Sequence, residues 1–434
     1  MRQSAVILAL GWALAPLQFL TAIMVARVLG PDGKGMLAIL TGLTAIVASL
    51  IGLGMPSGVA AVYHRQPDVR ASLIATALSI TAATSLLVIG LYFWAGPRIL
   101  LAIVSQQDLA AFDSSWVLLA VLTVLPTALT AVIDVTLILS DAMRTYSVRA
   151  AVSGLLTVVI TWVLTLELGW GLTGALVGYA VGSSVGVAVF LHWLARQRGC
   201  GGWWISVRSA LTLLHVGVQQ YAISVIALVS KRIDVFLVAS LLSVEQAGFY
   251  AAGILVPLAI VIVPRATMWP MVSVLSRTDS RRGSDSVTGI SGLQVAVMLL
   301  LSASLGLAAP WLVRWLFGEA FLPSTPSFRW ALLGVPFTPL TVTVNAILTA
   351  RGRPGLSILS AAIGTSIQVA LAVLLIPRWG AHGGAAALSA NFIVTALIQL
   401  ALVRAQGTRV TALLIPTRED VRLLVNALRA RVST

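Results

Sequence analysis

The side chains in this sequence with the clearest chemical potential are cations that lie inside long apolar segments. Lys231, Arg232 and Arg265 each occur in a stretch that is otherwise almost uncharged. A charge at membrane depth costs on the order of several kcal/mol, so such residues indicate a functional site or an ion pair. Arginine offers a planar fork to phosphate oxygens, and lysine offers a point charge. We therefore predict that these cations bind a phosphate-bearing anion, with an ion pair between helices as the alternative.

The segment 212–240 places several polar groups along one side of a predicted helix. At about 100° per residue, Ser224, Lys231 and Asp234 fall within about 40° of Gln220. Lys231 and Asp234 are close enough in sequence to neutralise each other, whereas Arg232 lies roughly 100° from this polar stripe. Lys231 lies roughly 14 Å from the outer end of the segment at 1.5 Å per residue. These residues predict a polar stripe that faces a cleft.

Other cations extend this series towards both ends of the membrane. Arg265 lies among three prolines, which predicts a broken helix at that arginine. Arg27 closes the outer end of the first apolar segment, and Arg144 lies at the cytoplasmic entrance of the fifth. From Arg144 through Arg265 and Lys231 to Arg27, the series predicts a cleft lined with positive charge. The alternatives are that Arg27 snorkels to the interface and that Arg144 only sets membrane orientation.

The composition restricts the chain to membrane-spanning helices. Of its 434 residues, 59% are hydrophobic and 10% are charged, with a mean hydropathy of +0.99; soluble domains carry about 25% charged residues. The apolar segments are too long for barrel strands and lack their alternation. The net charge of +14 is explained by basic loops that set orientation, so no nucleic-acid partner is predicted. With a single cysteine and no catalytic cluster, we predict no catalytic residue, no metal site and no cofactor.

Hydropathy and helix breakers predict an all-α polytopic protein with about twelve transmembrane helices. Arginines are concentrated in one set of connecting loops, which places those loops and both termini in the cytoplasm. The last residues have helical apolar spacing, which predicts a short amphipathic helix at the interface, with a solvated terminus as the alternative. The predicted spans are 5–28, 36–62, 70–95, 115–140, 147–167, 171–195, 212–240, 246–273, 288–311, 328–349, 355–376 and 383–404.

The sequence contains a weak internal repeat. VARVLGPDGKGMLA at 25–38 matches VASLLSVEQAGFYA at 238–251, with Gly35 on Gly248. WGLTGALVG at 170–178 matches WGAHGGAAA at 379–387, with Gly171 on Gly380. Because each copy holds an even number of spans, the repeat is parallel and predicts two six-helix lobes around a central cleft. The predicted domains are an N-terminal lobe at 1–195, a cytoplasmic linker at 196–211, a C-terminal lobe at 212–405 and a cytoplasmic tail at 406–434.

Glycines at four-residue spacing in the sixth predicted span form one helix face. A face of small residues allows a neighbouring helix to approach closely, so this seam is predicted to be structural. Its members are Gly174, Gly178, Gly182 and Gly186.

Four segments carry a resemblance to a known family. They are VARVLGPDGKG, LIGLGMPSGVAAVYHR, WGLTGALVG and KRIDVFLVASLLSVEQAGFYAAG. In these segments the chain resembles the polysaccharide-biosynthesis flippases of the multidrug/oligosaccharidyl-lipid/polysaccharide exporter superfamily. The resemblance implies that an undecaprenyl-diphosphate-linked oligosaccharide moves from the cytoplasmic to the periplasmic leaflet of a bacterial inner membrane, by alternating access. It also implies O-antigen or exopolysaccharide assembly, with membrane lipids, a polysaccharide polymerase and chain-length machinery as partners.

Three other functions remain open at this stage. A multidrug exporter of the same superfamily carries cations and needs buried carboxylates, whereas only Asp134, Glu167 and Asp234 lie in or near the predicted spans. A peptidoglycan lipid II flippase is the second alternative, but that family usually has more spans than the twelve predicted here, which argues against it. A polytopic glycosyltransferase or polymerase needs catalytic carboxylates or a large outer loop. GPDGKG at 30–35 lacks the Walker A spacing, so direct ATP hydrolysis is not predicted.

Overall fold

The computed structural model describes residues 2–63, 69–95, 113–196, 204–215, 217, 232–268, 271, 280–406, 410 and 413, and their side chains except for 2–17, 95 and 280–288. These residues form helices and short turns, and no strand occurs among them. Ten helices in the described residues are long and apolar enough to cross a membrane. The protein is an all-α polytopic membrane protein, as the composition predicts.

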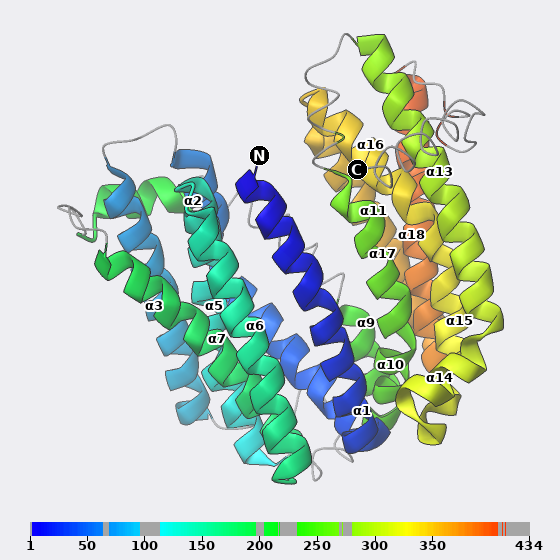
Figure 1. Ribbon diagram of the computed structural model, residues 1–434, viewed down its shortest axis with the longest axis horizontal. Helices are drawn as coiled ribbons and strands as arrows, with labels where there is room; N and C mark the ends of the chain where they lie inside the picture. The colour runs from blue at the N-terminus through cyan, green and yellow to red at the C-terminus, as the bar shows by residue number, and fades with distance from the viewer. Residues whose placement is uncertain are drawn as a thin grey trace. The chain divides into compact units, whose positions relative to one another are not determined.

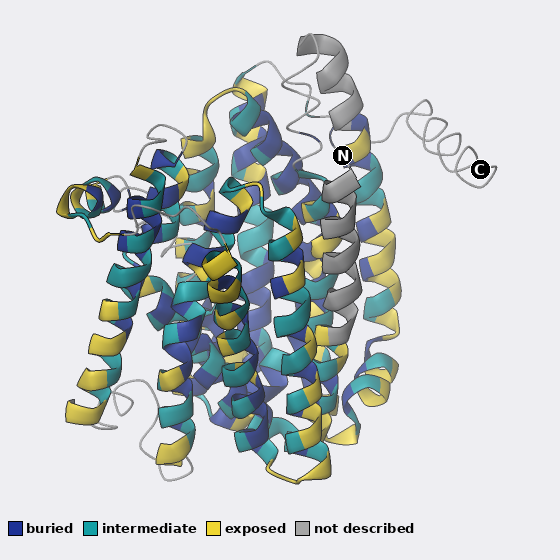
Figure 2. Ribbon diagram, turned by 60° about the vertical axis from the view of Figure 1, so that its left-hand side comes forward, coloured by how far each residue is buried: buried dark blue, intermediate teal, exposed yellow. Residues whose placement is uncertain are grey.

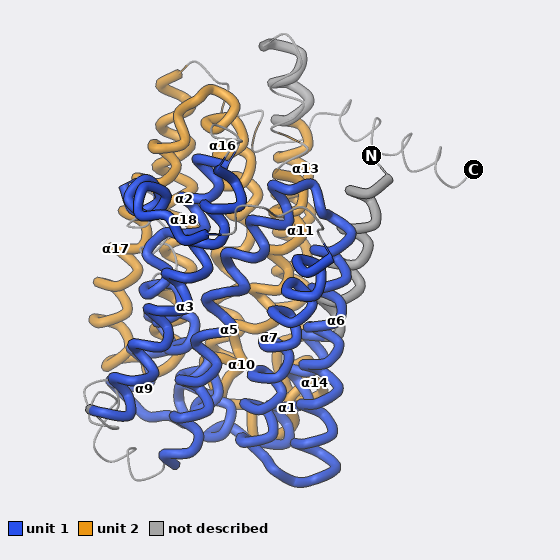
Figure 3. Tube along the Cα trace, turned by 90° about the vertical axis from the view of Figure 1, so that its left-hand side faces the viewer, with its two compact units in different colours: residues 1–248 blue, residues 249–434 orange. Residues whose placement is uncertain are grey.

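The chain divides into two compact units, Met1–Gly248 and Phe249–Thr434 (Figure 3). This division differs from the predicted domain boundary at 196–211, because α9 (Ile233–Leu241), which follows the predicted linker, contacts α1 (Arg2–Ile51). The repeat in the sequence and the compact units are therefore different divisions of the chain. The predicted domain organisation stays a prediction, and each unit is described here by itself.

The first unit is built from long helices with few breaks (Figure 1). Residues 64–68, 96–112, 197–203, 216 and 218–231 of this unit lie outside the described residues. Its helices are α1 (Arg2–Ile51), α2 (Met55–Val62), α3 (Arg70–Ala95), α5 (Ser114–Leu139), α6 (Met143–Trp162) with the π-helical η3 (Val163–Glu167), α7 (Gly171–Arg196) and α9 (Ile233–Leu241).

Helix α1 is two helices that meet at Gly30. The Gly30 backbone has φ 68° and ψ −175°, a conformation that favours glycine. We call residues 2–29 the first arm and residues 31–51 the second arm of α1; Figure 1 shows them in successive shades of blue. The arms correspond to the first two predicted spans. The second predicted span, 36–62, is interrupted again by a turn at 52–54 before α2 begins, so it is not one continuous helix.

Helix α5 lies at the centre of the first unit, in contact with α1, α2, α3, α6 and α7. One buried cluster joins Leu37 and Leu40 of α1, Val117 of α5, and Leu172 and Leu176 of α7. Large apolar side chains also remain exposed on the outside of the helices, as expected for surfaces that meet lipid (Figure 2). Helix packing in this unit therefore depends on shape as well as on apolar burial.

The glycine seam of α7 packs against α6 and η3, as predicted. A methyl group on Gly174 would lie 2.8 Å from the Leu164 carbonyl carbon, and one on Gly178 would lie 2.9 Å from the Thr161 backbone nitrogen. The Ser153 hydroxyl of α6 donates a 2.6 Å hydrogen bond to the Gly182 carbonyl. The seam holds α6 and α7 closer together than any larger residue would allow.

The second unit is a bundle in which α18 contacts α15, α16 and α17. Its aromatic core includes Phe249, Phe317 and Phe321, whose rings are in contact. Its elements, of which α10 begins before the unit boundary, are α10 (Val244–Ile260), α11 (Ile262–Ala266), α13 (Ser280–Leu307), α14 (Ala309–Phe317), η4 (Glu319–Ser324), α15 (Thr325–Gly334), η5 (Val335–Phe337), α16 (Thr338–Ala350), α17 (Pro354–Trp379) and α18 (Ala381–Ala405).

Most predicted spans coincide with one of the ten candidate membrane helices. Two predicted spans fall in a single candidate, Gln18–Ile51, which contains the break at Gly30. The predicted span 212–240 includes residues outside the described part of the chain, so it is not counted among the ten. The predicted span 288–311 ends later than α13, which ends at Leu307; a separate short helix then begins at Ala309, with Pro310 in its first turn.

The internal repeat is visible in the backbone of the two units. Gly171 at the start of α7 has φ +54°, and its sequence partner Gly380, immediately before α18, has φ +72°. Within each unit, the next matched glycine then packs against the preceding helix: Gly174 meets Leu164 and Gly383 meets Leu375. Matched residues thus make matched helix turns.

The N-terminus of α5 carries a charged cap that predicts a pH effect. The Asp113 carboxylate accepts a 3.0 Å hydrogen bond from the Ser115 backbone N–H, and this bond lowers the pKa of Asp113. Since the folded pKa lies below the unfolded value of about 3.9, the cap stabilises the helix end above that pH and is lost as the pH falls through the folded pKa.

We expect hydrogen exchange at Ser115 and Trp116, corrected for intrinsic rates, to stay constant between about pH 8 and 5, where the carboxylate stays ionised. Asp113→Ala should raise exchange at all pH values, because the backbone N–H loses its acceptor. Asp113→Asn keeps an acceptor that does not titrate, so hydrogen exchange in this variant should be constant over the whole pH range. Equal exchange in wild type and Asp113→Ala would contradict the cap.

Candidate functional site

The two copies of the repeat contact each other at their matched glycines. A methyl group on Gly35 would lie 2.9 Å from the Val244 carbonyl carbon, and one on Gly248 would lie 2.7 Å from the Pro31 carbonyl carbon. Pro31 and Val244 are themselves matched by the repeat, as are the two glycines. The second arm of α1 and the first turn of α10 therefore cross reciprocally. We call these four residues the glycine crossing.

Arg232 and Asp234 lie in the first unit at the start of α9. Arg232 is the N-cap residue and is half-buried; a methyl group on Gly42 would lie 3.9 Å from its Cδ and 3.3 Å from the ring of Phe236. Asp234 is 2% exposed, and its carboxylate accepts a 2.9 Å hydrogen bond from the Val235 backbone N–H. Arg232 thus projects towards the second arm of α1.

The other predicted site residues are distributed over the chain. Arg27, near the end of the first arm of α1, is exposed, and so is Arg144 in the first turn of α6. Arg265 belongs to the second unit and is exposed in α11. Lys231, Gln220 and Ser224 lie outside the described residues, so the polar stripe of the predicted seventh span stays a prediction.

The helix interruption predicted near Arg265 is present. Helix α10 ends at Ile260, Val261 forms a turn, and α11 covers Ile262–Ala266. Pro264 lies inside α11, and the Thr267 hydroxyl donates a 2.7 Å hydrogen bond to its carbonyl. The break places Arg265 in the last turn of a short helix, where a positive charge is favourable.

Sequence reasoning missed a buried ion pair. Arg149 of α6 pairs through Nη2 with Oδ1 of Asp134 in α5, and the side chains are 7% and 29% exposed. The Arg149 guanidinium also lies over the ring of Tyr146, 5.8 Å from its centroid, while Nε has no partner in the described residues. The two residues belong to different helices, and nothing in their sequence spacing paired them.

Lys34 is a second residue whose role was missed. It lies in the second arm of α1 and is 9% exposed, although the sequence indicated only a loop charge there. The signal available in the sequence was the position of Lys34 beside Gly35, a glycine that the repeat matches.

Several polar residues of the second unit join neighbouring helices. Asn391 donates a 2.6 Å hydrogen bond to Gln368, and Gln399 donates hydrogen bonds of 3.0 Å to Asn345 and 2.9 Å to Ser360. These contacts connect α16 and α17 to α18. Interhelical hydrogen bonds of this type are worth roughly 0.6 to 2 kcal/mol each in a membrane.

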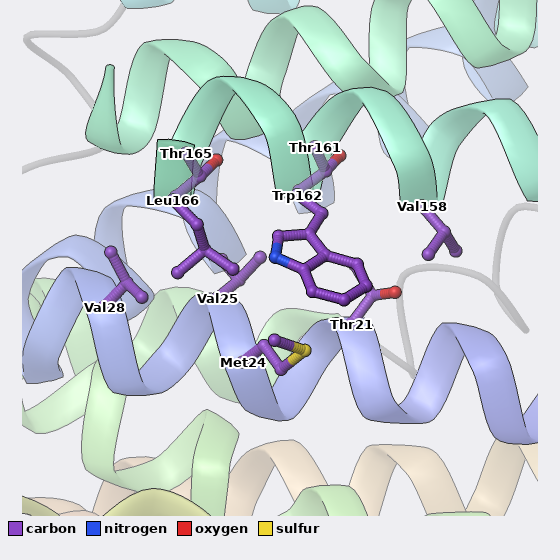
Figure 4. Close-up of a pocket in the computed structure, with 9 residues that line it drawn as sticks. All are labelled: Thr21, Met24, Val25, Val28, Val158, Thr161, Trp162, Thr165 and Leu166. Carbon is purple, nitrogen blue, oxygen red and sulfur yellow. The ribbon is translucent and has the colours of Figure 1, made fainter. Parts of the chain in front are cut away.

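A shallow apolar pocket lies between the first arm of α1 and the end of α6 (Figure 4). Its lining includes no charged side chain, so it cannot neutralise a phosphate group. The lining residues are Thr21, Met24, Val25, Val28, Val158, Thr161, Trp162, Thr165 and Leu166.

The arrangement of helices defines the class of protein. The chain is similar to a multidrug resistance MATE family transporter of the MOP superfamily in an inward-facing conformation, with a TM-score of 0.72 and 14% identity over 92% of this chain and 94% of that chain. It is also similar to the lipid II flippase MurJ in an inward closed conformation, with a TM-score of 0.78 and 12% identity over 98% and 92%. A MOP superfamily transporter from Pyrococcus furiosus has a TM-score of 0.62 and 15% identity over 95% of each chain.

At these identities the similarity shows the fold, which is that of the MOP superfamily, and it confirms the predicted fold class of about twelve transmembrane helices. Residues 24–326 match the polysaccharide biosynthesis protein family. The match covers more than half of the chain, so this chain belongs to the polysaccharide biosynthesis protein family, as its motifs predicted. A comparison with curated proteins finds no match.

Proposed function

We propose that this protein is a flippase for an undecaprenyl-diphosphate-linked oligosaccharide. The substrate moves from the cytoplasmic to the periplasmic leaflet of a bacterial inner membrane, by alternating access and without ATP hydrolysis. The glycan then enters O-antigen or exopolysaccharide assembly, with a polymerase and chain-length machinery as partners. Both termini lie in the cytoplasm, and the protein forms and breaks no covalent bond in the substrate.

The observation that carries the proposal is the sign of the charge in the membrane helices. Lys34 is buried and Arg232 is half-buried within the first unit. Of the buried or partly buried carboxylates described there, Asp134 is paired with Arg149, and Asp234 near Arg232 is the second. Excess positive charge favours an anionic headgroup and disfavours a cationic drug. Membership of a polysaccharide biosynthesis family supports a glycan attached to that headgroup.

The polarity of the site also separates this proposal from multidrug export. The lipid II flippase, which has the same fold, is named for a lipid-linked substrate. In the Pyrococcus furiosus transporter, the reverse polarity of the binding pocket suggests a different function. By the same reasoning, a cationic site on this fold supports a substrate that carries a diphosphate.

We expect Lys231→Ala and Arg265→Ala, at normal protein levels, each to reduce surface polysaccharide by about tenfold or more. A charge-assisted hydrogen bond is worth about 1.5–3 kcal/mol, which corresponds to at least that factor. Lipid-linked intermediate should accumulate in the inner leaflet of the same cells. Arg378→Gln, which removes an exposed cation at the end of α17, is the matched control and should leave output unchanged.

Polysaccharide output that is unchanged in both alanine variants would remove the role given to these cations. Efflux of a cationic dye that depends on the protein, without any change in lipid-linked intermediate on deletion, would instead support the multidrug exporter. Loss of glycan transfer onto the lipid, with the intermediate never formed, would support the polytopic glycosyltransferase.

A further inference from the structure

Helix α14 carries two large aromatic side chains on its exposed face. Trp311 is 85% exposed, and Trp315, one turn later, is 73% exposed. Residues four apart lie on the same side of a helix, so the two indole rings project from one face of α14. Indole rings are amphipathic and are enriched where a membrane meets water. This face therefore requires an environment that accepts large aromatic rings.

The opposite face of α14 fixes the helix to the second unit. Ala309, Val313 and Phe317 follow one another at four-residue spacing and are buried. The ring of Phe317 contacts the ring of Phe321 in η4, with 5.7 Å between the centroids. Each tryptophan comes two residues, or about 200°, after a buried residue, so the exposed and buried faces are opposite. The core of the second unit therefore sets the direction in which the tryptophans point.

Helix α14 lies at one end of the second unit, next to α15 (Figure 1). The candidate span α13 ends at Leu307, and the Gly306 carbonyl accepts a 3.0 Å hydrogen bond from Nε of Arg329 in α15. Directly after Arg329, Trp330 stacks on Trp379, the last residue of the candidate span α17, with 5.5 Å between ring centroids. Two membrane spans thus end at about one level, marked by a tryptophan pair, and α14 begins at this level.

The lipid-facing surface of α13 leads directly to α14. Leu300 and Leu307 are exposed on this candidate membrane span, so lipid covers them. After α14, Leu322 of η4 adds exposed apolar surface. The tryptophan face is therefore continuous along the chain with a surface that lipid covers, and lipid is the occupant that this position favours.

The charges around α14 balance each other. Nη2 of Arg314, in the last turn of α14, forms an ion pair with Oε1 of Glu319, and both side chains are exposed. These two residues are the charged residues of the segment 308–328, which has no net charge. Apolar burial, rather than attraction to anionic headgroups, is then the force that binds the segment to a membrane. Sugar binding needs polar side chains directed at hydroxyl groups, whereas here the two charged side chains are directed at each other.

We propose that α14 is an interfacial helix whose exposed face, Trp311 and Trp315, inserts into the headgroup–acyl boundary of the bilayer. Its partner is a phospholipid surface, with no requirement for anionic lipid. The connection from α13 to α15 lies on the side that the loop arginines predict to be periplasmic, so the outer leaflet is the surface bound. The helix fixes the level of the second unit in the bilayer at this end. This inference is independent of the proposed function and concerns no transported substrate.

The experiment measures the depth of single nitroxide labels on the full-length protein in phosphatidylcholine vesicles. Labels are attached at Trp311→Cys or Trp315→Cys in a Cys200→Ser background, and collision rates with oxygen and with a water-soluble nickel chelate give the depth. Both labels should lie about 5–10 Å into the headgroup–acyl boundary, the depth of interfacial helices. Leu300→Cys in α13 is the reference for hydrocarbon, and Arg353→Cys, exposed before α17, is the reference for water.

A second measurement leaves both tryptophan positions free of label. A nitroxide at Ala308→Cys, exposed just before α14, reports the depth of the helix start. The pair Trp311→Glu and Trp315→Glu should move this label towards water, because ionised carboxylates are unfavourable at the boundary. The pair Trp311→Phe and Trp315→Phe is the matched control and should leave the depth unchanged. Adding phosphatidylglycerol should change none of these depths, because the segment is neutral.

Nickel collision rates at both tryptophan positions equal to that at Arg353→Cys would overturn the proposal. A depth that appears only with phosphatidylglycerol would contradict binding through apolar burial. Shielding from both reagents, with dipolar broadening that grows with the protein-to-lipid ratio, would identify a second copy of the chain as the occupant instead of lipid. Shielding that appears only when a soluble oligosaccharide is added would identify a sugar instead.

Discussion

Arg149→Ala is expected to destabilise the first unit by about 3–5 kcal/mol. The change leaves the Asp134 carboxylate in a largely buried position without its cation, and breaking a buried ion pair from one side has a cost of that size. The packing of α6 against α7 should weaken as well, because the Arg149 Nη1 atom lies 3.1 Å from the position of a methyl group on Gly186. The measurement is the thermal unfolding midpoint of the purified protein in one detergent.

Two variants make this expectation specific to the ion pair. Asp134→Leu combined with Arg149→Met removes both charges and keeps the volume, so it should be close to the wild type in stability. Arg144→Ala removes an exposed cation one turn earlier on α6 and should change the midpoint little. If Arg149→Ala and Arg144→Ala lowered the midpoint equally, the ion pair would not stabilise the unit.

The repeat and the helix pattern could be predicted because they depend on local residue types. Gly171 and Gly380 were matched from sequence, and both adopt a positive φ at a helix start. The seam from Gly174 to Gly186 was predicted from four-residue spacing alone, and it packs on α6. The lengths of the apolar segments and the positions of helix-breaking residues predicted most spans, because a membrane helix must satisfy its own backbone hydrogen bonds.

The partners of the charged residues could not be predicted, because they come from helices far apart in the sequence. Arg149 and Asp134 lie on different helices, and their pairing depends on the rotation of each helix about its axis. Lys34 looked like a loop charge because Gly30, Pro31 and Gly33 suggested a tight turn between two spans, whereas the chain turns at Gly30 alone and is helical from Pro31 onwards.

Gly248→Ala is expected to open the glycine crossing, with a cost of about 1–3 kcal/mol or more. The new methyl group would lie 2.7 Å from the Pro31 carbonyl carbon and closer still to its oxygen, so backbone must move. Gly35→Ala should have a similar effect, because its methyl group meets the matched carbonyl of Val244. In the double variant the second substitution should cost less than the first, since the helices have already separated.

The separation can be measured directly at two exposed residues that the repeat matches. Spin labels are attached at Asp32→Cys and Glu245→Cys in a Cys200→Ser background. Pulsed electron paramagnetic resonance then reports the distance between the start of the second arm of α1 and the start of α10. We expect that distance to increase in Gly248→Ala and in Gly35→Ala. Gly90→Ala on α3, where no atom lies within 4 Å of the added methyl group, should leave it unchanged and should stabilise the helix slightly. Unchanged distances in both crossing variants would show that the reciprocal contact does not hold these helices together. A change of the distance in only one of the two variants would show that Gly35 and Gly248 contribute unequally to the glycine crossing.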